Sequence, residues 1–160
     1  MGSTAQGDAG AVSNLHDGQI LFVLDTLNAG EVNEAQAALP KLTNADVQDF
    51  AQDMIEDHGS ARERLSQLAQ EQQMPPEASE IATGLQDESQ SVVERLLAAE
   101  ATEVDTVYVQ SQQAAHTEAL ALLAQLLMAA DAEPLRAQLT ELRASVQEHL
   151  DRAQTLPGAR

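Results

Sequence analysis

The sequence contains no cysteine and no tryptophan, and its aromatic residues are one tyrosine and two phenylalanines. The absence of cysteine excludes disulfide bonds and thiolate metal sites. The scarcity of strand-forming aromatics and the abundance of Ala, Gln, Leu and Glu favour helices, because unbranched side chains lose little freedom there. At 160 residues the chain is long enough for one domain with an aliphatic core.

Positive charge is also scarce. Eight basic residues face 26 acidic ones, which gives a net charge of −18, and Lys41 is the one lysine. A surface of this kind repels phosphate groups, so neither nucleic acid nor an anionic membrane is expected as a partner. Cations, a basic protein or a saline habitat remain as explanations of the acidity.

Long hydrophobic runs are missing as well, so no transmembrane segment is expected. The small, polar stretch "TAQGDAGAVSN" is typical of a leader that remains after a signal peptide is removed. We therefore expect a flexible leader over residues 1–16, a single helical domain over 17–156 and a tail over 157–160. This organisation favours a periplasmic or otherwise extracytoplasmic location.

Turn and cap residues divide the domain into helices. We expect four long helices, over about residues 17–39, 44–72, 102–130 and 131–156, and an additional short helix over about Leu85–Ala99. The expected N-terminal caps are Asp17, Thr43 or Asn44, Thr102 with Asp105, and Asp131. Short links within the first and last pairs imply antiparallel neighbours, so the predicted fold is an all-α, antiparallel four-helix bundle.

Each long helix carries one ionisable residue on its core-facing stripe. In "FAQDMIEDHGSARERL", Met54, His58 and Ala61 follow one another at steps of four and three residues. The same spacing places Glu31, His116 and His149 among apolar residues of the other helices.

These four residues are the candidate metal ligands: His58, His116, His149 and Glu31. Buried polar groups need partners, and facing helices that bear imidazole and carboxylate groups are how bundles hold metals. Neutral imidazole suits Zn, Cu, Fe or Ni. The alternative is a hydrogen-bonded layer in the core, or side chains at the wet edge of the bundle.

Distances from the turns rank the candidates. His116 and His149 are at similar distances from the turn that joins their helices, so they should meet at one level. Glu31 and His58 differ by about 6 residues, which is about 9 Å along a helix. Asp25 matches the level of His58 but lies off the core-facing stripe. Neighbours in sequence, such as Asp57 and His58, point to different sides of the helix.

Other chemistry has little support in the sequence. No Gly-rich phosphate loop or nucleophile elbow is present. A di-iron site needs Glu-x-x-His on two helices, but the residues three before the histidines are Ile55, Gln113 and Val146. We therefore expect a protein that is not an enzyme.

Several segments together resemble a known family: "NAGEVNEAQAAL", "NADVQDFAQDMIEDHGSARERLSQLA", "VDTVYVQSQQAAHTEALALL" and "LRASVQEHL". The chain resembles domain of unknown function 4142, a bacterial family of small exported proteins, over about Asp17–Leu156. The resemblance implies a ferritin-like helical bundle and an extracytoplasmic location. It also implies that the three histidines are a family feature, without assigning them a reaction.

Two functional interpretations follow from the sequence. The first is an extracytoplasmic bundle that binds a transition-metal ion through its core-facing histidines. The second is a non-catalytic interaction or structural module, whose histidines only make hydrogen bonds in the core and whose acidic surface recruits a basic protein.

Overall fold

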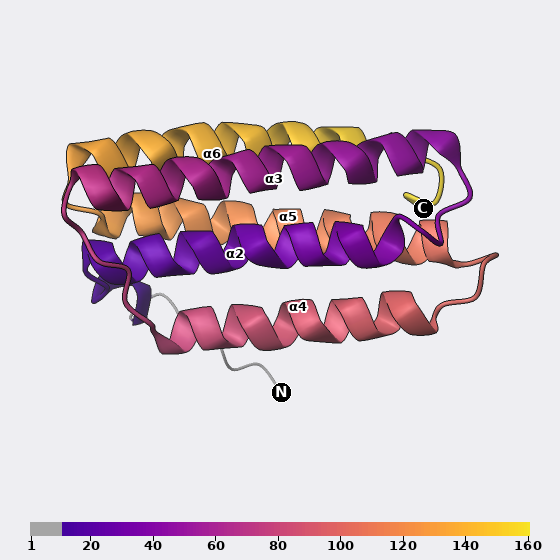
Figure 1. Ribbon diagram of the computed structural model, residues 1–160. Helices are drawn as coiled ribbons and strands as arrows, with labels where there is room; N and C mark the ends of the chain where they lie inside the picture. Colours follow the sequence, from indigo (N-terminus) through magenta and orange to yellow (C-terminus); the bar gives the residue numbers. More distant parts are fainter. Residues whose placement is uncertain (1–10) are drawn as a thin grey trace.

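The computed structural model describes residues 11–160, which contain five long helices and no strand. The helices are α2 (Asp17–Ala38), α3 (Ala45–Glu71), α4 (Glu80–Ala98), α5 (Val104–Ala129) and α6 (Glu133–Ala153) (Figure 1). The predicted all-α class is confirmed for this part of the chain. Within it, no helix is long and apolar enough to cross a membrane.

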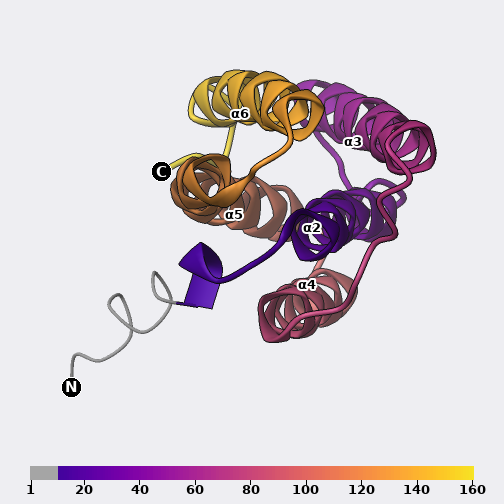
Figure 2. The same cartoon turned by 90° about the vertical axis from the view of Figure 1, so that its left-hand side faces the viewer.

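Four of the helices surround a common core, and the fifth lies outside it. Figure 2 shows α2, α3, α5 and α6 around the core, with α4 against the outer side of α2. The approach of α4 to α2 is close at Gly30, where a Cβ atom would lie 2.9 Å from Ser89 Oγ. A larger residue at position 30 would therefore require the Ser89 side chain to move.

The start of α3 is as predicted, but three other caps differ. Asn44 Oδ1 accepts hydrogen bonds from the amides of Asp46 and Val47. Asp17 and Asp105 instead accept bonds from the starts of other helices: Asp17 from the amides of residues 131 and 132, and Asp105 from those of residues 43 and 44. The N-caps of α2, α5 and α6 are His16, Glu103 and Ala132. Sequence spacing alone could not show that a carboxylate caps a helix to which it does not belong.

The additional helix α4 is longer than the expected 85–99 segment. It begins at Glu80 because the Ser79 side chain accepts a bond from the Ala82 amide, ahead of the apolar residues that marked it in the sequence. At its other end, Lys41 Nζ donates to the carbonyls of Leu96, Leu97 and Ala99 at 2.7–2.8 Å. The one lysine of the chain thus supplies partners for the free carbonyls at the end of this helix.

A polar layer divides the core into two apolar clusters. One cluster contains Leu24, Ala61, Leu123 and Leu139, and the other contains Phe50 and further residues towards the opposite ends of the same helices. Between the two clusters, the following polar residues are buried: Thr26, Asn28, Glu31, Glu34, His58, Ser111, Gln112, His116 and His149. The fold therefore gathers its buried polar groups in one band, which on α2 extends from Thr26 to Glu34.

The expected leader lies partly outside the described residues. Of its last six residues, 11–13 form a helical turn, and Val12 is buried in the apolar core. The helix α2 follows this segment and begins at Asp17.

Candidate metal centre

The three predicted histidines meet in the polar layer. His58 comes from α3, His116 from α5 and His149 from α6, and their ring centroids are 5.1–5.8 Å apart. One ligand nitrogen from each ring lies within 4.8 Å of the other two. The side chains are almost fully covered, with exposed fractions of 1%, 1% and 7%. We call these three residues the histidine cluster.

Asn28 fixes the orientation of the first ring. Its Nδ2 group donates to the Leu24 carbonyl at 2.7 Å, so its Oδ1 atom is an acceptor. This oxygen lies 2.8 Å from His58 Nδ1. The proton of His58 is therefore on Nδ1, and Nε2 carries a free lone pair.

The other two rings are oriented by different acceptors. His116 Nδ1 is 2.9 Å from the Gln112 carbonyl, which can only accept, so this nitrogen is the donor. His149 Nε2 is 2.9 Å from Asp57 Oδ2 and donates to that carboxylate. The partner of each ring comes from the main chain or from a side chain outside the cluster.

Each histidine is left with one unprotonated nitrogen. These are His58 Nε2, His116 Nε2 and His149 Nδ1, and all three are buried without a hydrogen-bond partner among residues 11–160. Buried lone pairs without partners are uncommon in folded proteins and call for an explanation. Metal ligation would satisfy all three, and histidine ligands in metal sites characteristically donate their other N–H to a carbonyl or carboxylate, as these do.

Burial also keeps the cluster neutral. The pKa of His58 is well below its usual 6.5, mainly because burial removes water from the ring and secondarily because His116 and His149 lie close to it. Desolvation lowers the pKa of His116 to about 4, although its bond to the Gln112 carbonyl works in the opposite direction. The pKa of His149 is lowered by burial too, against the effect of Asp57. Neutral imidazoles are the form that binds a metal ion.

The spacing of the rings decides how much they must move to bind an ion. Two nitrogens bound to one tetrahedral zinc at about 2.0–2.1 Å are about 3.3 Å apart. The three ligand nitrogens of the histidine cluster lie up to 4.8 Å apart. Small side-chain rotations would bring them to the shorter spacing that a metal ion requires. Three ligands leave a fourth coordination position for water or another donor.

Glu31, the fourth predicted ligand, lies beside the cluster rather than within the group of three. Its Oε1 atom is 3.8 Å from His116 Nδ1, the nitrogen that carries the proton. Burial raises the pKa of Glu31 to about 7, in spite of the Gln112 amide. Its structural neighbour Glu34 has a pKa of about 8, raised first by burial and then by Glu31.

Sequence reasoning assigned no positioning role to three residues that orient the histidines: Asn28, Asp57 and Gln112. On α2, Asn28 is fully buried, whereas its apolar neighbour Leu27 is only partly buried. A step of four from Leu24, followed by a step of three to Glu31, would have identified Asn28. Asp25, considered at the level of His58, instead pairs with Arg62 at the surface.

The fold has a counterpart among solved structures. YcfI from Rhodopseudomonas palustris, for which a structural role has been proposed, matches with a TM-score of 0.68 and 14% sequence identity. The match covers 96% of this chain and 95% of that one, and at this identity it shows a common fold alone. No curated protein sequence matches the chain.

A family model matches nearly the whole sequence. It is described as a domain of unknown function (DUF4142) and covers residues 1–156. The resemblance seen in the histidine-bearing segments is thereby confirmed, and the chain belongs to the family of domain of unknown function 4142.

Proposed function

We propose that this protein binds one transition-metal ion through His58, His116 and His149. The observation that carries the proposal is the set of three buried nitrogens, each without a partner in the described part of the chain and each backed by a donor bond on the other side of its ring. An all-nitrogen set suits Zn, Cu, Fe or Ni. The proposal is one of binding, not of catalysis, because the features that support it are ligands.

Acidic side chains near the cluster favour a cation. Three neutral imidazoles carry no negative charge, so they would leave the charge of a divalent ion in the protein core uncompensated. Asp57, bonded to His149, and Glu31, beside His116, would offset part of that charge. In this proposal Glu31 acts through its charge and its contact with His116.

Isothermal titration calorimetry with Zn, Cu, Ni and Fe tests the proposal. The wild type should bind one equivalent, and the variant with His116→Ala and His149→Ala should lose most of the affinity. His16→Ala is the matched control, because His16 is an exposed histidine that pairs with Glu77 at the surface. Equal affinity in the wild type and the double variant would rule out the site.

The lowered histidine pKa values define the pH range of binding. An ordinary histidine begins to lose its ligand form near pH 6.5, whereas the pKa of His116 is about 4. Metal binding should therefore persist in mild acid and be lost as the pH approaches 4, where protons compete for the same nitrogens.

A second candidate is a non-catalytic interaction or structural module. It is favoured by the net charge of −18, which would attract a basic protein, and by the likeness of the fold to YcfI. Elemental analysis of protein purified without a histidine tag separates the two candidates. A metal-free sample that also fails to bind added metal would favour the module.

We also assign the fold to the ferritin-like, antiparallel four-helix bundles and the protein to an extracytoplasmic compartment. The first assignment is supported by the short links that join α2 to α3 and α5 to α6. The second is supported by the small, polar composition of the stretch "TAQGDAGAVSN". Cell fractionation in a native host, with detection by antibody, tests the location.

A further inference from the structure

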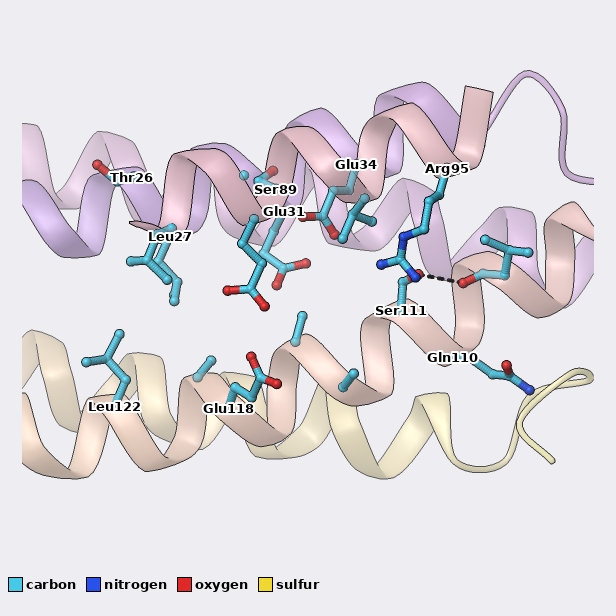
Figure 3. A pocket seen from close by; sticks show the side chains of 18 residues that line it. Thr26, Leu27, Glu31, Glu34, Ser89, Arg95, Gln110, Ser111, Glu118 and Leu122 are labelled. Atoms are coloured by element: carbon cyan, nitrogen blue, oxygen red, sulfur yellow. Dashed lines mark hydrogen bonds between the residues drawn. The ribbon is translucent and has the colours of Figure 1, made fainter. Parts of the chain in front are cut away.

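A cavity lies beside the histidine cluster, between α2, α4 and α5. Its volume is about 370 Å³, which is in the range of small-molecule sites. Figure 3 shows Glu31 and Glu34 pointing into it from α2, and Glu118 from α5 on the opposite side. Glu88 of α4 is the fourth carboxyl group in its lining. We call this cavity the acidic pocket.

The four carboxyl groups form a floor and a mouth. Glu31 and Glu34 are buried, with exposed fractions of 5% and 4%, whereas Glu88 and Glu118 are exposed. The pocket is therefore acidic from its opening to its base. Arg95 contributes the one basic side chain to the lining, so carboxyl groups outnumber it by four to one.

The floor contains a carboxylate oxygen that lacks a partner. Glu31 Oε2 is buried and accepts no hydrogen bond from any residue between 11 and 160. Glu34 differs, because its Oε2 accepts a bond of 3.1 Å from Gln112 Nε2. Glu31 is part of the pocket lining, and a buried carboxylate oxygen that lacks a donor is complementary to a ligand that brings one.

The charge and the spacing of the pocket select the class of ligand. Four carboxyl groups exclude an anion, and the net charge of the chain raises the local concentration of cations. A compact metal ion needs three or more ligand atoms close together. Among the described residues, the histidine cluster meets that condition, while the pocket carboxylates form no such group.

The remaining lining is apolar and favours an organic cation. Leu27, Leu85, Val92 and Leu122 contribute apolar side chains to the lining. An ammonium group has three donors for the carboxylates, and an attached alkyl chain would gain from contact with these side chains. Burial also raises the pKa of Glu34 to about 8, so its charge lacks compensation in the free protein.

We propose that the acidic pocket binds a small alkylamine, whose ammonium group is held by Glu31 and Glu34 while its alkyl chain lies against the apolar walls. This site adjoins the metal centre at Glu31, which lies 3.8 Å from His116 Nδ1, but the proposal does not depend on metal binding.

The test is calorimetric titration of EDTA-treated protein with 1,4-diaminobutane at pH 8 and physiological ionic strength. The uncharged analogue 1,4-butanediol and magnesium chloride are the comparison ligands. The diamine should bind with one-to-one stoichiometry, and the diol and Mg²⁺ should bind at least about tenfold more weakly. Equal affinity for the diol or for Mg²⁺ would overturn the proposal.

Two variants locate the ligand. Glu31→Gln with Glu34→Gln keeps the shape of the floor and should weaken diamine binding at least about tenfold. Ala115→Leu fills the cavity without changing its charge and should also weaken binding, since Ala115 is part of the lining. Glu141→Gln is the matched control, because it removes one exposed carboxylate of α6, away from the pocket.

The pair of variants keeps the test decisive. If Ala115→Leu binds the diamine as tightly as the wild type, the ligand lies on the acidic surface and the proposal is wrong. If Glu141→Gln weakens binding as much as the floor variant, the effect is one of net charge, and the proposal is again wrong. Circular dichroism of each variant shows that the fold is intact, and zinc titration of Ala115→Leu and Glu141→Gln shows that the histidine cluster is intact.

Discussion

The histidine cluster and the acidic pocket are neighbours in the same polar layer, and burial acts on them in opposite directions. In the cluster, burial lowers the pKa of the bases, and His116 reaches about 4. In the pocket, burial raises the pKa of the acids, to about 7 for Glu31 and about 8 for Glu34. Near pH 7 the histidines are thus neutral and Glu34 is mostly protonated.

The difference lies in the number of protons held relative to the unfolded chain. The folded histidines bind fewer protons, so their contribution to stability is present above pH 6.5 and is lost as the pH falls towards 4. The folded glutamates bind more protons, so their contribution is present below pH 4.5 and is lost as the pH rises through about 7 and 8. Between pH 4.5 and 6.5 the two regions oppose each other.

The largest effect is expected when the three histidines are removed and the buried glutamates remain. In a variant with His58, His116 and His149 all changed to Gln, the glutamates act alone. Its free energy of unfolding should rise by on the order of 3 kcal/mol as the pH is lowered from 6.5 to 4.5. Denaturant titrations at a series of pH values, followed by circular dichroism, measure this slope.

The wild type should show a much smaller change over the same interval. The reverse variant, Glu31→Gln with Glu34→Gln, should lose the decline in stability that the wild type shows between about pH 6.5 and 8. If the triple variant instead becomes less stable as the pH falls from 6.5 to 4.5, the assignment of raised pKa values to the pocket is wrong.

The second-largest difference between the two regions is expected in the free energy of unfolding after a metal ion is added. Zinc at about one hundred times its dissociation constant should raise the free energy of unfolding of the wild type by about 2.7 kcal/mol. Addition of EDTA should reverse this gain, and thermal unfolding followed by circular dichroism measures both steps. The triple histidine variant should gain nothing, whereas the glutamate variant should retain most of the effect.

Asp57 should affect the cluster without affecting the pocket. Because its carboxylate accepts the Nε2 proton of His149, Asp57→Asn should reduce zinc affinity by about 10–100-fold. Asp53→Asn is the matched control on the same helix, since Asp53 pairs with Arg152. Similar losses in both variants would show that the effect is a general one of surface charge.

The smallest effect is expected at the residue that joins the two regions. The Gln112 carbonyl accepts a bond from His116, and its side chain donates to Glu34. Gln112→Met keeps the carbonyl and removes the side-chain donor. The free energy of unfolding should fall by about 1 kcal/mol, and zinc affinity should change less than about twofold. A large loss of zinc affinity would mean that the two regions are not separable.

The placement of the histidines and the approximate helix ranges could be predicted from the sequence. The periodicity of apolar residues placed His58, His116 and His149 on core-facing stripes, and counting from the final turn brought His116 and His149 to one level. The composition and the caps predicted helices near the observed ranges. These features follow from local rules, because a helix fixes which residues share a face.

Contacts between distant segments were decided by the tertiary structure. The sequence predicted that Asp57 and His58 point to different sides of their helix. The bond of Asp57 to His149, 92 residues away, has no signature in the sequence. Asp17 and Asp105 have the residue type and position of caps, yet they serve helices to which they do not belong.

By itself, the sequence determined an acidic chain of helices in which every long helix carries an ionisable residue on its inner face. Only the tertiary structure decided which nitrogen of each histidine stays free, and that Glu31 lies between the cluster and a pocket covered by α4. The physical reason is that a helix sets the direction of its side chains through local backbone geometry. Partners, burial and pKa depend on which helices pack together, and that arrangement minimises the free energy of the whole chain.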